Sequence, residues 1–220
     1  MIKNKTVFLI VFACLLVIFA GCSSGSSTST EGSGDNGEQS SDSEEKVLNV
    51  AMNAAPPNLD YPTQNAVATR DTARLIFETL VTTNSDYEAV PMLAESVDVS
   101  DDNQTYTFHL RENVKFHNGK EMTSEDVVAS MERWMDVSSL TGRIFDGATW
   151  DAEDDYTVVL QLDKPSVLTL DTLASAKQSP AIMPKEVVEG ATAEGVEEYI
   201  GTGPFEFVEW KQDQYIHFTK

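Results

Sequence analysis

The chain has 220 residues, of which 36 are acidic and 15 are basic, and its formal net charge is −21 at pH 7. This length fits one or two domains. The composition excludes a nucleic-acid partner, because phosphate binding needs clustered Lys and Arg and no basic run follows Lys5. The acidity is typical of a solubilising surface.

The first 22 residues have the pattern of a lipoprotein leader. Lys3 and Lys5 precede an unbroken apolar run over residues 7–20, which is too short for an ordinary membrane span. The run ends in Phe-Ala-Gly-Cys, and small residues before a Cys resemble a lipobox. We therefore expect a signal peptide over residues 1–21, cleavage before Cys22 and a diacylglycerol on the Cys22 thiol. The alternative is a plain signal peptide that contains a Cys.

Residues 22–46 predict a disordered linker that begins at the lipidated Cys. After Cys22 this stretch is rich in Ser, Gly, Thr, Asp and Glu and contains no apolar residue, so it cannot bury surface. The chain has 2 Cys. Because Cys14 leaves with the signal and Cys22 is acylated, we expect no disulfide, Cys metal site or Cys nucleophile in the mature domain.

The folded part begins with two short elements. Alternating apolar residues over 48–52 predict a half-buried strand, which the Pro-rich residues 55–60 break. Further apolar residues recur at helical spacing and predict an amphipathic helix that starts near Thr69. Its expected buried face consists of Ala73, Ile76, Phe77 and Leu80.

Residues 92–135 predict the order strand, turn, strand, turn, helix. Val97 and Val99 indicate a half-buried strand, and the acid-rich residues 100–104 indicate a turn. The second strand has one apolar face, formed by Tyr106, Phe108 and Leu110. Asn118-Gly119 is a tight-turn dipeptide. Thr123 can cap a helix with Asp126 in its first turn, and the buried stripe of that helix is expected to be Val127, Met131, Trp134 and Met135.

The remaining residues alternate between short elements and loops. The expected order begins with a loop over 142–149, an acidic turn over 151–155, a strand over 156–162 and a short helix after Pro165. An irregular buried segment or a strand end over 180–184, a helical turn over 196–200, and strands around 205–210 and from 215 follow. The acidic turns at Asp101 and Asp154 are followed by similar residues, which indicates two similar hairpin turns.

Two separated parts of the chain resemble the extracellular solute-binding proteins of family 5, the oligopeptide-, dipeptide- and nickel-binding receptors of ABC importers. The resemblance covers residues 48–220. It rests on Leu93-Ala94-Glu95-Ser96, on Thr105-Tyr106-Thr107-Phe108-His109-Leu110-Arg111, on Val114-Lys115-Phe116-His117-Asn118-Gly119, on Thr123-Ser124-Glu125-Asp126-Val127-Val128, and on Gly201-Thr202-Gly203-Pro204-Phe205-Glu206-Phe207-Val208-Glu209-Trp210.

This resemblance implies a mixed α/β fold of the type II periplasmic-binding-protein kind. Residues 47–220 would be the N-terminal lobe, with a subdomain inserted over about residues 67–199. A second lobe would follow Lys220, so we expect an N-terminal fragment.

The implied function is that of a substrate-binding lipoprotein. As a monomer on the outer face of the cytoplasmic membrane, it would capture extracellular peptides and deliver them to the permease subunits of an ABC transporter. Two alternatives stay open: the same receptor for nickel chelates or oligosaccharides, or a non-transport lipoprotein such as a chaperone or enzyme.

The family's cleft-lining positions fall at Asn65 and Val67. Their backbone would pair with an extended peptide, as in strand addition; a plain surface loop is the alternative. Trp150 lies in a loop-rich region and is a third candidate for ligand contact, with core packing as its alternative.

No catalytic, cofactor or metal site is expected. His109, His117 and His217 show no spacing typical of metal ligands, and no Gly-x-Ser-x-Gly nucleophile motif is present. Adjacent acids such as Asp101 and Asp102 are expected in turns or at helix ends. Adjacent carboxylates in a strand would point to opposite faces, so such pairs are poor acid/base pairs.

Overall fold

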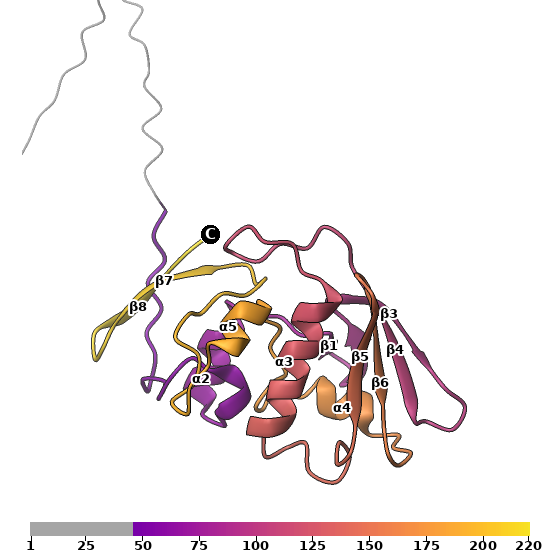
Figure 1. Ribbon diagram of the computed structural model, residues 1–220. Helices are drawn as coiled ribbons and strands as arrows, with labels where there is room; N and C mark the ends of the chain where they lie inside the picture. The colour runs from indigo at the N-terminus through magenta and orange to yellow at the C-terminus, as the bar shows by residue number, and fades with distance from the viewer. Residues whose placement is uncertain (1–45) are drawn as a thin grey trace, which may run out of the picture. The chain divides into compact units, whose positions relative to one another are not determined.

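The computed structural model describes residues 46–220, so the predicted signal peptide, Cys22 and all of the predicted linker except Lys46 lie outside the described residues. Residues 49–220 form one unit, shown as a ribbon in Figure 1. Its elements are η1 Tyr61–Thr63, α2 Val67–Ala73, β1 Val81–Thr83, β2 Ala89–Pro91, β3 Ala94–Val99, β4 Thr105–Leu110, α3 Ser124–Val137, β5 Thr149–Asp154, β6 Thr157–Gln161, α4 Thr169–Leu173, α5 Lys185–Glu189, β7 Glu206–Lys211 and β8 Tyr215–Thr219.

An antiparallel sheet in the order β3-β4-β6-β5 is the largest layer of the unit. The predicted apolar face of β4 is confirmed, because its burial alternates and Tyr106, Phe108 and Leu110 are buried. Phe108 lies opposite Val158 of β6, which is also buried. One face of the sheet therefore packs against the core, while the other carries the partly exposed polar residues of β4.

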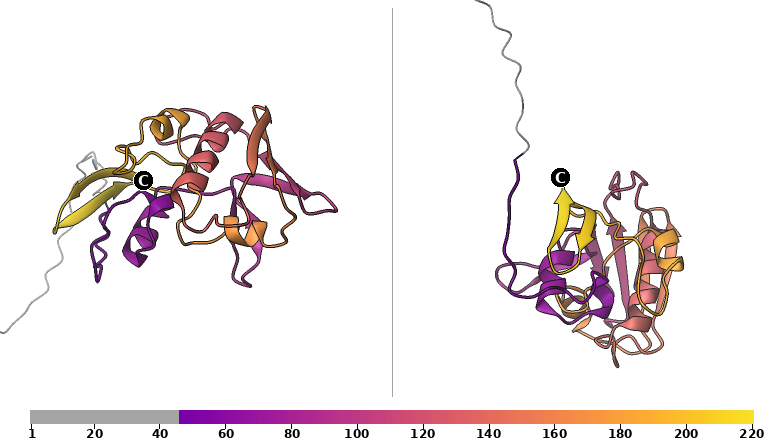
Figure 2. Two further views of the ribbon diagram at one scale, coloured as in Figure 1. Left: turned by 60° about the horizontal axis from the view of Figure 1, so that its bottom comes forward. Right: turned by 90° about the vertical axis from the view of Figure 1, so that its left-hand side faces the viewer.

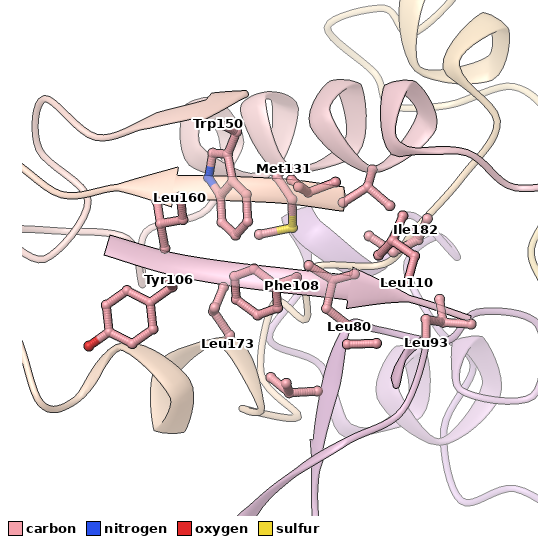
Figure 3. Packing of buried hydrophobic residues seen from close by; sticks show 14 of the residues in the cluster. Leu80, Leu93, Tyr106, Phe108, Leu110, Met131, Trp150, Leu160, Leu173 and Ile182 are labelled. Atoms are coloured by element: carbon pink, nitrogen blue, oxygen red, sulfur yellow. The ribbon is translucent and has the colours of Figure 1, made fainter. Parts of the chain in front are cut away.

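Helix α3 covers the core face of the sheet along β5 and β6 (Figure 1). The predicted cap is confirmed, because Thr123 and Asp126 form a capping box. Three residues of the predicted stripe, Val127, Met131 and Trp134, are fully buried, and Met135 is half-buried. The sheet, α3 and α4 enclose a first core drawn from residues 80–182, part of which Figure 3 shows.

A second core is drawn from residues 59–77 and 181–218. The β7–β8 hairpin packs on it beside α2 (Figure 2). A bulge between Phe207 and Glu209 shifts the register of β7, so Phe207 and Trp210 both face this core despite their odd spacing. The inserted subdomain over residues 67–199 stays a prediction.

The predicted half-buried strand over 48–52 is wrong. Residues 46–58 form no strand, and Leu48 is 85% and Val50 74% exposed. Alternation gives the pattern of a strand but not its partner, and no strand among the described residues pairs with this segment.

The predicted helix ends earlier than its apolar pattern indicates. Helix α2 runs from Val67 to Ala73, although Ile76, Phe77 and Leu80 are buried as expected. The carbonyls of Leu75 and Ile76 accept hydrogen bonds from outside, from Phe205 N at 3.0 Å and Gly203 N at 2.8 Å. These distant partners replace the helical bonds that would extend α2.

Two further predictions near the acid-rich stretches are wrong. Residues 149–154 form the edge strand β5, so the acidic turn predicted over 151–155 begins only at Asp155, because an edge strand can expose its charged side chains and needs few apolar ones. Residues 196–200 form no helical turn, and helix α5 over residues 185–189 was not predicted. The acidic hairpin turns are confirmed: Asp102 accepts from Gln104 N at 3.1 Å, and Asp154 accepts from Tyr156 N at 2.8 Å.

The irregular buried segment is also confirmed, since Ala181, Ile182 and Met183 are buried outside any helix or strand. Among residues 46–220, no helix combines the length and the apolar character needed to cross a membrane.

Candidate functional site

The segment from Asn58 to Val67, which we call the cleft segment, carries two of the three predicted ligand contacts. Asn65 is exposed, and Val67, the first residue of α2, is 56% exposed. Their neighbours Gln64 and Ala66 have extended backbones, with φ/ψ of −114°/135° and −66°/132°. No backbone hydrogen bond of Asn65 forms among residues 46–220. The backbone at this point is therefore extended and free to pair with a ligand strand.

An ion pair attaches the start of the cleft segment to α3. The Arg133 guanidinium donates to both oxygens of Asp60, at 3.0 and 2.6 Å. Asp60 is 2% exposed and the Arg133 side chain 10%. A two-point pair of this kind fixes orientation as well as distance. Gly195 lies so close that an added Cβ would be 2.8 Å from Asp60 Oδ2, which leaves the carboxylate little space on that side.

Gln178 forms a second attachment. Its side-chain carbonyl accepts from Ser139 N at 3.0 Å and from Ser139 Oγ at 2.8 Å, at the end of α3. Its amide donates to Thr63 O of the cleft segment at 3.4 Å, and its backbone carbonyl accepts from Trp134 Nε1 at 2.6 Å. Gln178 has a positive φ of 43°, so the loop is locally strained where these bonds meet.

Tyr61 points away from the exposed side of the cleft segment. The side chain is buried and its hydroxyl donates to Ala176 O at 3.1 Å. Burial raises the pKa of the Tyr61 phenol, so it stays a neutral donor at physiological pH. Residues 60–63 of the cleft segment are thus held by Arg133, Ala176 and Gln178, all of which are distant in the sequence.

Trp150, the third predicted contact, lies apart from the other two. It is 3% exposed on β5 and packs against Phe108 of β4, with ring centroids 5.5 Å apart. Figure 3 shows its indole in the same packed space as Met131. Its Nε1 has no hydrogen-bond partner among the described residues. Trp150 therefore belongs to the first core and offers no surface to a ligand there.

Two of the resembling motifs meet at His117. The Gly201 N–H donates to Nδ1 of the imidazole at 3.4 Å, and Nε2 lies 2.9 Å from Gly203 O. Because Nδ1 accepts, the proton sits on Nε2, which donates to the carbonyl. The predicted tight turn beside it is confirmed, with Gly119 at φ +83°. These motifs fix the position of the chain that enters β7, so their role in the described residues is structural.

A polar cluster stands at the opposite end of α3 from Arg133. Asp126 is fully buried and accepts from Thr123 N at 3.0 Å, Lys120 Nζ at 2.6 Å and Lys185 N at 2.8 Å. Lys120 also bonds Glu186 at 2.7 Å. Burial lowers the pKa of Lys120, but the bonds to Asp126 and Glu186 raise it more, and the Lys120 bond lowers the pKa of Glu186. Lys120 and Glu186 are therefore both ionised at neutral pH.

Two hollows lie elsewhere on the unit. A groove of about 560 Å³ runs between α3 and α5, and one of about 610 Å³ lies over the ends of the four strands of the large sheet, from Glu95 of β3 to Thr157 of β6. Neither is lined by Asn65 or Val67. In residues 46–220, no group of three or more His, Cys, Asp and Glu side chains is placed to hold a metal ion. We therefore locate the candidate site by the free backbone of the cleft segment.

Comparison with sequence families gives a match over residues 88–220 to a family described as bacterial extracellular solute-binding proteins, family 5 Middle. Among curated proteins, the dipeptide-binding protein DppE of Bacillus subtilis is 31% identical over 218 residues, covering 91% of this chain and 40% of that protein. The oligopeptide-binding protein AppA of the same organism is 28% identical over 226 residues and is covered to 41%. The chain thus spans about two fifths of the length of these relatives.

Solved structures have the same fold. NikA from Brucella suis, in complex with Fe(III)-EDTA, has a TM-score of 0.69 at 28% identity, covering 79% of this chain and 35% of that one. AppA from Bacillus subtilis, in complex with a nonapeptide, has a TM-score of 0.63 at 26% identity, covering 74% and 34%. The predicted mixed α/β fold of the type II periplasmic binding proteins is confirmed.

Proposed function

The chain belongs to the bacterial extracellular solute-binding proteins of family 5, and we propose that it acts as the substrate-binding lipoprotein of an ABC transporter that imports peptides. Capture would be its mechanism, and no chemical step is assigned to it. A ligand that binds the closed form better than the open one shifts the equilibrium between them. The closed form would then deliver the peptide to the permease subunits.

The exposed backbone of the cleft segment is the observation that carries the peptide assignment. Within residues 46–220, Asn65 leaves its backbone groups unbonded between extended neighbours, on a segment fixed by Asp60, Tyr61 and Thr63. Backbone pairing suits peptides of varied sequence, because every peptide carries the same main-chain donors and acceptors. The names of DppE and AppA, which bind dipeptides and oligopeptides, agree with this choice.

A metal chelate is the second candidate ligand. NikA was solved with Fe(III)-EDTA, and NikZ from Campylobacter jejuni with Ni(L-His). Such ligands need specific side-chain contacts rather than a free strand edge. Titration calorimetry of the full gene product with a peptide mixture and with nickel–histidine separates the two. We expect a saturable heat with peptides, and a response to nickel–histidine alone would remove the peptide assignment.

Asn65→Pro is expected to weaken peptide binding about fivefold, because the substitution removes one main-chain N–H worth about 1 kcal/mol. The preceding residue has the extended conformation that a following proline requires, at φ −114° and ψ 135°. Asn65→Ala is the matched control and keeps the N–H, so its affinity should stay within about twofold of wild type. Equal losses in both variants would show that the side chain, and not the backbone, makes the contact.

We also propose anchoring by a lipid on Cys22, which places the receptor on the outer face of the cytoplasmic membrane as a monomer. The charged start, the apolar run and the small residues before Cys22 support it. A thioether-linked lipid with one or more further acyl chains gives stable attachment. In cells, Cys22→Ala should abolish the incorporation of a labelled fatty acid into the protein. A variant that takes up the label as wild type does would remove the lipid proposal.

A further inference from the structure

The Asp60–Arg133 pair joins the two cores. Arg133 lies on α3, directly before Trp134, which is fully buried in the first core. Asp60 lies between Leu59 and Tyr61, which are both buried in the second core. The α3 end of the pair is fixed by tight packing around Trp134, so the guanidinium presents its donors from a rigid element.

Asp60 also begins the turn that leads to Asn65. Its carbonyl accepts from Thr63 N at 3.1 Å and from Thr63 Oγ1 at 2.9 Å, and Gln64 N then donates to Tyr61 O at 3.3 Å. One residue thus uses its carboxylate to hold α3 and its carbonyl to hold η1. A change in the direction of Asp60 would be passed to Gln64 and Asn65 through these two bonds.

A buried ion pair is not needed for stability alone. Removing two charges from water costs about as much as their attraction returns, and apolar replacements are often no less stable. A two-point pair does, however, fix a geometry that apolar packing leaves freer. The pair lies at Asp60, directly before the turn that leads to the exposed backbone of Asn65. This position indicates that the pair contributes by fixing the conformation of that segment.

We propose that Arg133 is a positioning residue for ligand binding, which acts through Asp60 to hold the cleft segment in its binding conformation. This inference rests on the proposed function, in which the backbone of Asn65 pairs with the ligand. A receptor whose binding conformation is populated only in part loses apparent affinity by that fraction. Arg133 would therefore set affinity without touching the ligand.

Arg133→Met tests the inference, and Lys120→Met is its matched control. Both variants remove the cation that pairs with a buried carboxylate. The carboxylate is Asp60, which pairs with α3, in Arg133→Met, and Asp126, a residue of α3, in Lys120→Met. Lys120 touches Asp126 and Glu186 and has no hydrogen bond to the cleft segment. A purely structural loss should affect the two variants alike.

The first measurement is amide hydrogen exchange without ligand. The reporters are Thr63 and Gln64, whose N–H groups are bonded inside η1. We expect their exchange to rise about tenfold or more in Arg133→Met, relative to the first-core strand β4, and to stay near wild type in Lys120→Met. Unchanged exchange in Arg133→Met, or the same rise in both variants, would overturn the inference.

The second measurement is the affinity for the peptide mixture. The peptide affinity of Arg133→Met should fall about tenfold, while that of Lys120→Met should stay within about twofold of wild type. Arg133→Lys keeps the charge but loses the two-point hydrogen bonding of the guanidinium, so its affinity should lie between those of wild type and Arg133→Met. Arg133→Lys also replaces Arg133→Met if the latter does not fold. If wild type binds no peptide, the proposed function fails, and the exchange result still decides whether Arg133 positions the segment. Equal peptide affinity in wild type and Arg133→Met would overturn the inference.

Discussion

Gly201→Ala is expected to lower the free energy of unfolding by about 3 kcal/mol or more, which is a large part of the stability of a typical domain. A Cβ at this position would lie 2.2 Å from Ile76 O and 2.8 Å from Phe77 Cδ1. The Ile76 carbonyl cannot move aside, because it accepts from Gly203 N at 2.8 Å. The added methyl group would therefore separate the loop before β7 from the end of α2.

Urea unfolding of the variant and of wild type, followed by tryptophan fluorescence, measures this loss. Gly119→Ala is the matched control, since nothing lies within 4 Å of its added Cβ. Its positive φ of 83° should cost about 1 kcal/mol. A Gly201→Ala variant no less stable than the Gly119→Ala control would contradict the close approach of the two backbones.

The sequence predicts elements well where local signals and tertiary packing agree. The burial of β4 and the cap of α3 follow from alternation and from Thr123 with Asp126, and both are present. Strand β5 was missed because an acidic edge strand resembles a turn in composition. Helix α2 was predicted too long because the bonds that end it come from Gly203 and Phe205, well over a hundred residues further along the chain.

The candidate site could be predicted only in part, for the same reason. Asn65 and Val67 follow from the family resemblance, and the structure places both on the surface. Arg133 and Gln178 gave no signal, because a lone Arg on a helix and a Gln in a loop look like ordinary surface residues. What makes them partners of Asp60 and Thr63 is chain folding over 73 and 115 residues. Trp150 was misplaced because the strand that buries it was not predicted.

Asp126→Ala is expected to cost about 3–5 kcal/mol of unfolding free energy, which makes it comparable to the loss at Gly201. Both carboxylate oxygens accept: Oδ2 takes the Thr123 N–H, and Oδ1 takes Lys120 Nζ and the Lys185 N–H. Removing the group leaves two backbone donors unsatisfied, each costing about 1–3 kcal/mol when buried. It also removes the helix cap and the partner of Lys120.

Asp126→Asn should recover only a part of this loss, because an amide has one acceptor oxygen and its NH₂ group would face a donor on the other side. Asp136→Ala is the matched control on the same helix, where the carboxylate is exposed, and it should change stability by less than about 0.5 kcal/mol. Urea unfolding at neutral pH gives all three values. If Asp126→Ala were as stable as the Asp136 control, the bonds from Asp126 to Lys120 and α5 would not stabilise the fold.

The free energy of unfolding should be lowest in Asp126→Ala, intermediate in Asp126→Asn and highest in wild type. This order follows because both carboxylate oxygens accept hydrogen bonds, so a neutral residue of the same shape cannot replace Asp126.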